Sequence, residues 1–189
     1  VLGTVPVEAD GSAFFRAPGG AALFFQALDA DGFAVQTMRT VTHVQAGQTM
    51  SCAGCHEPRN CAPPRSRPLA AARHPSRITV GPEGSWPLRF DRLVQPVLDE
   101  HCVTCHRPDS PNAAAVARLD LTPSKAYESL VSYGSPSLRD QVQAAYREGR
   151  SIPGAGGSHQ SRLMALLLGG HHDVRLDHAD LNRLVTWID

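Results

Sequence analysis

Four of the five cysteines in the chain belong to two copies of the pentapeptide Cys-x-x-Cys-His. The six residues that define the two copies are Cys52, Cys55, His56, Cys102, Cys105 and His106. This pentapeptide is the attachment signature of c-type haem, in which the two thiols bond to the vinyl groups of one porphyrin. The histidine that follows directs its imidazole at the iron from the same turn. The repeat therefore predicts two covalently attached haem c groups.

Other uses of paired cysteines fit this pattern less well. Two Cys-x-x-Cys pairs can form a structural zinc site, but in zinc ribbons the pairs lie about 15 to 20 residues apart. Here 46 residues, from 56 to 101, separate the pairs, and zinc gives no reason for a histidine after both. A thioredoxin-like redox pair needs a βαβ context, which the sequence lacks. Disulfides are possible in an oxidising compartment, but a bond between cysteines only three positions apart would constrain a very short loop.

The second axial ligand decides whether a haem transfers electrons or binds a substrate, and histidine is the first choice for it. His171 and His172 follow a predicted helix end and the pair Gly169-Gly170. Glycine gives the backbone the freedom that lets an imidazole approach a flat cofactor. We therefore expect His171 or His172 to ligate the iron of the second haem. The alternative is that both histidines lie on a polar turn.

No residue stands out as the distal ligand of the first haem. His43 lies in a strand pattern and His74 in a proline-rich segment, so both are weaker candidates. Met50 is too near Cys52 to fold back over the opposite face of the porphyrin. An open iron site at the first haem is therefore a second expectation.

The remaining histidines and the fifth cysteine are given structural roles. His101 adjoins Cys102, so its side chain is not expected to reach round either porphyrin. His159 and His178 are interpreted as surface or capping residues. Cys61, just beyond the first pentapeptide, is most simply a small buried apolar residue.

Residues 1–56 are predicted to form a β-rich domain that ends in the first haem motif. Short β-prone runs alternate with turn signals that supply glycine where hairpins need positive φ. These signals are Asp10-Gly11-Ser12, Pro18-Gly19-Gly20 and Asp31-Gly32. The pattern predicts four or five antiparallel strands in a sandwich-like piece.

Residues 57–87 are rich in proline, arginine, alanine and serine, a composition typical of a linker or wrapping loop. From residue 88 to 189 the apolar period becomes helical, which predicts a cytochrome c-like domain around the second haem. Its first helix leads into Cys102, with a kink or break expected at Pro96. Trp86 and Trp187 are expected to pack against porphyrin or core. The fold class is therefore α+β: a β piece followed by a mainly helical domain.

Capping signals delimit three later helices. One is predicted around residues 138–148 with Gly149 at its end. A second runs through residues 162–168 with Ser161 as its cap. A third starts at Asp177, with Asp180 three residues on, and continues to residue 188.

Charge and hydropathy exclude several partners. Lys plus Arg equals Asp plus Glu at 18 each, so nothing points to nucleic acid or to an anionic membrane. The longest apolar runs fall far short of the roughly 18 residues that a membrane helix needs. The chain opens without Met on a strand-like stretch and stops inside a helical pattern. We interpret it as a piece of a longer protein.

The combination of these stretches resembles the hydrazine synthase alpha subunit and its broader relatives. The most specific part is "DGSAFFRAP…QALDADG…MR" leading into Cys-x-x-Cys-His-Glu, and "FDRLVQPVLDEHCVTCHRP", "GHHDVRL" and "RLVTWID" support it. The resemblance spans nearly the whole chain. It implies the middle and C-terminal dihaem portions of that subunit, with a β-propeller missing upstream.

The resemblance also implies residue roles. It makes the protein secreted, extracytoplasmic and dihaem, with His106 proximal and the first histidine of "GHH", His171, distal at a bis-histidine second haem. In the synthase a tyrosine four residues past the first motif histidine takes the catalytic iron. Asn60 occupies that position here and is a poor iron ligand. This departure puts hydrazine synthesis in doubt and returns His56 to an ordinary proximal role.

Three functions remain as hypotheses. The first is an electron-transfer module that carries single electrons between a redox partner protein and other domains or subunits of a larger assembly. The second is a haem oxidoreductase fragment, like hydrazine synthase, whose five-coordinate first haem acts on a small nitrogen or oxygen species. The third is a gas-sensing or structural role within an assembly.

Overall fold

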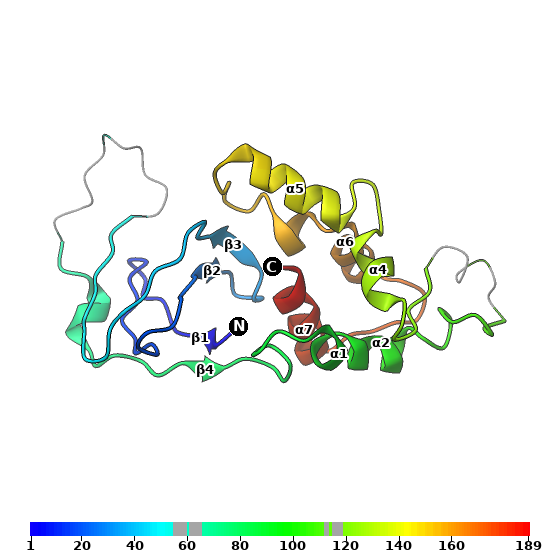
Figure 1. Ribbon diagram of the computed structural model, residues 1–189, viewed down its shortest axis with the longest axis horizontal. Coiled ribbons are helices and arrows are strands. Elements are labelled where there is room, and N and C mark those ends of the chain that lie inside the picture. Colours follow the sequence, from blue (N-terminus) through cyan, green and yellow to red (C-terminus); the bar gives the residue numbers. More distant parts are fainter. Residues whose placement is uncertain (55–59, 61–65, 112–113, 115–118) are drawn as a thin grey trace. The chain divides into compact units, whose positions relative to one another are not determined.

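A computed structural model of the chain describes residues 1–54, 60, 66–111, 114 and 119–189 (Figure 1). The chain divides into two compact units, which we call the helical unit and the loop unit. The helical unit comprises Val1, Gln26–Thr37 and Pro82–Asp189, and the loop unit comprises Leu2–Phe25 and Met38–Gly81.

The loop unit has little regular structure among its described residues. Strand β1 (Gly3–Thr4) pairs antiparallel with β4 (Thr79–Val80), and a short 3-10 helix, η1, spans Leu69–Ala72. Arg73 links distant parts of the unit: its guanidinium pairs with the Glu8 carboxylate at 2.5 Å and donates to the Phe14 carbonyl at 3.2 Å.

Gly3 allows the close pairing of β1 with β4. Its φ is +141°, a conformation that side chains with a Cβ rarely adopt. A Cβ there would lie only 1.9 Å from the Thr79 carbonyl oxygen, so no other residue fits without moving the strand.

The helical unit contains its own antiparallel hairpin, β2 (Gln26–Leu28) and β3 (Ala34–Thr37). The turn between them is closed by Asp29, whose side chain accepts hydrogen bonds from the Asp31 and Phe33 amides, each at 3.0 Å. The predicted turn at Asp31-Gly32 is confirmed.

The segment that leads into the second pentapeptide forms two helices, α1 (Phe90–Leu93) and α2 (Gln95–His101). The break between them falls at Val94, directly before the first turn of α2, which contains Pro96. Proline is tolerated in a first turn because its missing N–H would have no helical partner there. The break expected at Pro96 is therefore confirmed.

The predicted caps at Gly149, Ser161 and Asp177 are present, and a further cap at Ser137 was not predicted. Ser137 and Asp140 form a capping box at the start of α5 (Leu138–Glu148), and Gly149, with φ of +73°, ends it. The Ser161 side chain accepts from the Met164 amide at the start of α6 (Arg162–Leu168). Asp177 caps α7 in the same way. Helix α7 spans His178–Ile188. The unit also contains α4 (Ala126–Val131) and the 3-10 helix η2 (Gly157–Gln160).

One hydrophobic core lies within the helical unit. It is formed mainly by apolar faces of α1, α2, α4, α6 and α7, and its most buried side chains include Leu93, Val94, Leu130, Met164 and Leu184. Figure 1 shows α7 beside α1, and the two helices are in contact.

An aromatic cluster extends this core. The Trp187 ring on α7 meets the Phe90 ring edge-on with centres 5.1 Å apart, and Tyr127 meets Phe90 at 5.5 Å. The prediction that Trp187 packs against the core is confirmed. Trp86 is 68% exposed and does not pack against this core, so its packing against porphyrin stays a prediction. It lies in the loop before α1, where no packed helix covers it.

The α+β class is confirmed, but the β piece differs from its predicted form. The described residues contain two separate two-stranded sheets instead of four or five strands in a sandwich. The strands are 2 to 4 residues long. Prolines such as Pro6 and Pro82 lie just past the strand ends, where their missing N–H ends a ladder.

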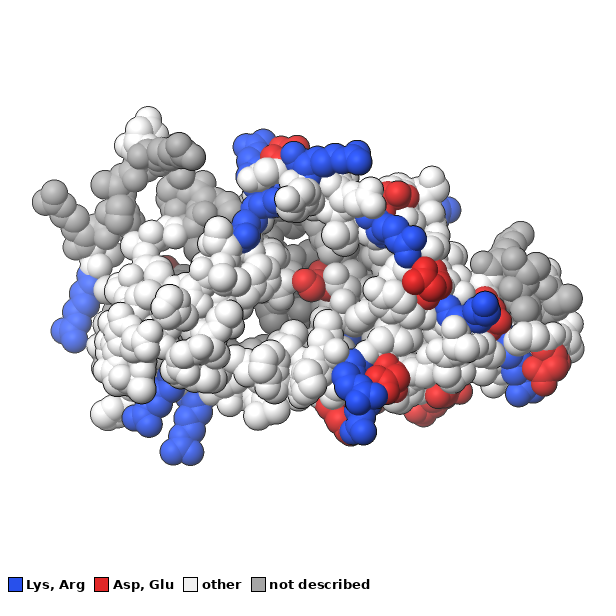
Figure 2. Space-filling model, in the orientation of Figure 1, with Lys and Arg blue, Asp and Glu red and all other residues white. Residues whose placement is uncertain are grey.

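The distribution of surface charge and the lengths of the helices agree with the balanced charge and short apolar runs of the sequence. On the face shown in Figure 2, acidic and basic side chains are interspersed over the helices. Within the described part of the chain, every helix is too short or too polar to cross a bilayer.

Candidate functional site

The second pentapeptide forms a turn at the C-terminal end of α2. The Leu98 carbonyl accepts from the Cys102 amide at 2.8 Å, which continues the helical path. The Cys102 carbonyl then accepts from the amides of Cys105 at 3.1 Å and His106 at 3.0 Å. These bonds place both thiols and the histidine on one turn, which is the local geometry that haem attachment requires.

The two cysteines of this turn differ in environment. Cys102 is half-buried and packs against the core, whereas Cys105 is exposed. Burial, with a smaller contribution from Cys105, raises the pKa of the Cys102 thiol to about 11. Cys102 is therefore a neutral thiol at physiological pH, and neither it, Cys105 nor Cys52 forms a disulfide.

A backbone carbonyl orients the His106 ring. The His106 Nδ1 lies 3.0 Å from the Leu119 oxygen. Since a carbonyl can only accept, Nδ1 carries the proton and Nε2 keeps its lone pair free for a metal. Ligating histidines are commonly held in this way, which fixes the tautomer and raises the basicity of the ligand.

The segment that supplies this carbonyl is itself fixed to α2. The buried Gln95 side chain donates from Nε2 to the Leu121 carbonyl at 3.2 Å. The Leu121 amide donates in turn to the His106 carbonyl at 2.9 Å. Gln95 is thus coupled to the orientation of the His106 ring through two backbone contacts.

His171 comes from a different element, the loop that follows α6. The helix ends where the Gly170 amide donates to the Leu167 carbonyl at 3.3 Å, and Gly170 then adopts φ of +90°. The turn is closed by the Val174 amide, which donates to the His171 carbonyl at 3.1 Å. The positive φ of Gly170, which the glycine pair was predicted to allow, lets the chain reverse direction after α6.

The rings of His106 and His171 lie close to each other. Their centres are 6.0 Å apart and their planes are inclined by 30°. A ligating imidazole nitrogen lies about 2 Å from its metal, and the ring centre about 1.1 Å behind that nitrogen. Two axial imidazoles on one iron therefore have ring centres about 6 Å apart. The observed separation matches this requirement.

The protonation of His171 also suits ligation. Burial lowers the pKa of His171 below its ordinary value of 6.5, and the neighbouring charges of His172 and His106 act in the same direction. The imidazole is therefore neutral at physiological pH, the form in which histidine binds a metal.

His172 lies beside this pair but does not share its geometry. Its ring meets the His171 ring edge-on at 4.6 Å, its side chain is exposed, and its backbone is left-handed with φ of +50°. Of the two histidines that the sequence left open, His171 is the one whose ring centre lies 6.0 Å from that of His106. The residues of the second pentapeptide and His171 thus fit a haem held between two imidazoles.

The first pentapeptide is largely outside the described residues. Cys55, His56 and Cys61 are not described, and Cys52 is exposed in the loop unit. The weaker candidates His43 and His74 are both exposed in that unit. The ligand set of the first haem therefore stays a prediction.

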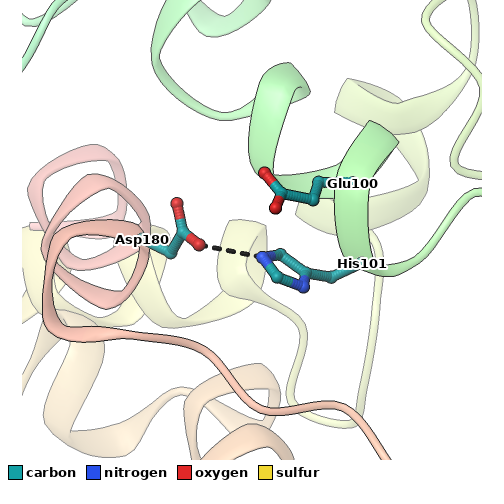
Figure 3. Close-up of side chains that lie close together, drawn as sticks. All are labelled: Glu100, His101 and Asp180. Carbon is teal, nitrogen blue, oxygen red and sulfur yellow. Dashed lines mark hydrogen bonds and ion pairs between the residues drawn. The ribbon is translucent and has the colours of Figure 1, made fainter.

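Sequence reasoning missed two interactions of histidines. His101 on α2 pairs through Nε2 with the Asp180 carboxylate on α7 at 2.8 Å, with Glu100 close by (Figure 3). His159 lies 3.3 Å from the Asp29 carboxylate. Both pairs join elements that are far apart in sequence, so no local pattern signals them. The Leu119 carbonyl was missed because backbone groups carry no residue signature.

A comparison with protein families relates the first part of the chain to a known domain. The family model of the hydrazine synthase alpha subunit middle domain matches residues 1–57. The match includes the whole first pentapeptide and leaves the second one, at Cys102, outside it. No curated protein and no solved structure matches the chain.

Proposed function

We propose that this chain is a dihaem c-type cytochrome module that carries single electrons. The observation that supports this most strongly is the proximity of the His106 and His171 rings, whose centres are 6.0 Å apart, at the turn that carries Cys102 and Cys105. When bound there, haem supplies an iron that changes between its ferric and ferrous states.

Each residue of this site has a distinct role in the proposal. Cys102 and Cys105 would bond to the porphyrin vinyl groups as thioethers. His106, held by the Leu119 carbonyl, would be the proximal ligand. His171 would be the distal ligand, presented neutral by its partly buried loop.

Two strong axial ligands favour electron transfer over substrate chemistry. An iron with two imidazole ligands has no open position for a substrate, whereas a single axial ligand leaves one. The second haem therefore suits an electron carrier. Its potential would be set by the two imidazoles, by the hydrogen bond to His106 and by burial.

A second candidate function rests on the first pentapeptide. Residues 1–57 match the middle domain of a subunit whose name denotes a synthase. An enzyme of this type would keep an open first haem, acting on a small nitrogen or oxygen species with electrons from the second. Asn60 occupies the position of the expected tyrosine ligand, so the electron-transfer function is our first proposal.

The same match supports an assembly. A domain related to one subunit of a synthase would work with other subunits or with further domains of its parent protein. A redox partner protein is then required to supply or accept electrons. Covalent haem attachment and the family relation together favour a periplasmic or other extracytoplasmic location.

The visible spectrum of the oxidised holoprotein tests this function. Two low-spin haems whose spectrum is unchanged by cyanide support electron transfer. A high-spin component that shifts on adding cyanide or nitric oxide supports the enzyme alternative at the first haem. Colourless protein that contains zinc would exclude both.

A further inference from the structure

Three potential metal ligands from two helices converge outside the haem site. Glu100 and His101 are consecutive residues at the end of α2, and Asp180 lies in the first turn of α7. One ligand atom from each lies within 4.8 Å of the other two. We propose that these residues bind a divalent transition metal ion of the Zn²⁺ class and so fasten α2 to α7.

The geometry is close to that of a metal site. Figure 3 shows both side chains of α2 directed toward Asp180. The His101 Nε2 already lies 2.8 Å from the Asp180 carboxylate. Ligand distances of about 2.0 to 2.2 Å in a tetrahedral site place neighbouring donor atoms about 3.3 Å apart. The His101–Asp180 pair therefore needs to open by about half an ångström around an ion.

Glu100 can complete the set at little structural cost. Its side chain is exposed, while His101 and Asp180 are about one-fifth exposed. The Glu100 carboxylate already lies within 4.8 Å of the other two ligand atoms, so only a small movement of an exposed side chain would be needed to reach an ion. Three protein ligands and one water molecule then give four-coordination.

The charge of the cluster also favours a cation. It contains two carboxylates and one imidazole, and among the described residues no lysine or arginine pairs with Glu100 or Asp180. Arg183, one turn after Asp180, instead donates to the Arg92 and Leu93 carbonyls, at 2.9 and 3.1 Å. A divalent ion would neutralise two carboxylates that, among the described residues, no lysine or arginine pairs with.

The donor types select the class of ion. Imidazole suits zinc, copper, nickel and iron, whereas magnesium and calcium take oxygen ligands almost alone. One nitrogen and two carboxylates in a site with few ligands therefore favour Zn²⁺ over Mg²⁺ or Ca²⁺. This site uses neither the cysteines nor His106, so it does not depend on the proposed haem function.

The test is a Zn²⁺ titration of the purified holoprotein in competition with a chromophoric chelator. We expect one Zn²⁺ bound per chain, unaffected by excess Mg²⁺. Glu100→Gln should weaken the affinity at least about tenfold, since the loss of supporting residues alone costs 10- to 100-fold. This variant leaves the His101–Asp180 pair in place, so folding is not at risk.

Two matched variants serve as controls. Glu148→Gln removes an exposed carboxylate from the end of α5, and His178→Ala removes an exposed histidine from α7. Neither should change the Zn²⁺ affinity. Three results would overturn the proposal: no binding by the unmodified protein, unchanged affinity in Glu100→Gln, or equal weakening in either control.

Discussion

The imidazoles of His106 and His171 lie with ring centres 6.0 Å apart, although 64 residues lie between them along the chain. The first ends a turn that begins with Cys102, and the second follows the glycine pair after α6. Neither element alone defines an axial ligand pair. Their convergence is the observation that supports our proposal of a six-coordinate haem at this site.

Substitution of the two adjacent histidines should separate their roles. His171→Ala should convert the second haem from low spin to high spin, because the iron loses its distal imidazole. His172→Ala, the matched control, should leave the spectrum unchanged. The measurement is the absorption spectrum of each oxidised holoprotein, and added imidazole should restore the low-spin bands of His171→Ala. Retention of a fully low-spin spectrum by His171→Ala would refute this ligand assignment.

The low-spin spectrum should resist mild acid. The pKa of His171 is lowered from 6.5, so its neutral form persists as the pH falls through that value and protonation occurs only at lower pH. A spectral pH titration should therefore place the loss of low-spin bands below pH 6.5. A midpoint at or above 6.5 would contradict the described environment of His171.

Gln95 should act as a positioning residue for the proximal ligand. Gln95→Ala removes the bond to the Leu121 carbonyl and loosens the segment that supplies the Leu119 carbonyl to His106. A weaker hydrogen bond makes the imidazole less basic, so the reduction potential of this haem should rise. Redox titration measures the potential.

The control for Gln95 is Gln141→Ala. Gln141 also donates to a backbone carbonyl, that of Gln160 at 3.1 Å, but it lies away from the His106 segment. Its substitution should leave the potential unchanged. Equal shifts in both variants would show a general loss of stability instead of a positioning effect.

The core of the helical unit should be sensitive to cavities. Leu184 on α7 is 2% exposed, whereas Leu168 at the end of α6 is 60% exposed. Leu184→Ala should lower the free energy of unfolding by about 2 to 5 kcal/mol, and Leu168→Ala should lower it by less than about 1 kcal/mol. Chemical denaturation followed by circular dichroism measures both. Similar losses for the two variants would argue against the described packing.

The helices from residue 90 to 101 and the three that begin after Ser137, Ser161 and Asp177 could be predicted because their signals are local. Ser137, Ser161 and Asp177 each cap a helix where the sequence predicts one, and the break before Pro96 follows from the missing proline N–H. The turn at Asp31-Gly32 is local in the same sense. The β piece was less predictable, because strand pairing depends on distant partners and, for the β1–β4 ladder, on the prolines just past the strand ends.

Some residues of the candidate site have a local sequence signal, and others are brought together only by folding. The cysteines and His106 are encoded by adjacent residues, so the pentapeptide alone predicts them. The choice between His171 and His172 depends on which ring the loop turns toward His106, and only the folded chain shows this. The His101–Asp180 pair joins two helices that no short pattern connects.

The central claim is that this chain carries two porphyrins bonded to its paired cysteines. Mass spectrometry of the mature protein after denaturation tests it most directly, because thioether-bound haem survives unfolding and extraction. The account predicts the mass of the chain plus two haems, and plus one haem when Cys102 and Cys105 are both replaced by serine. An unsubstituted protein with the mass of the chain alone or of the chain plus one haem, or a double variant that still carries two haems, would contradict it.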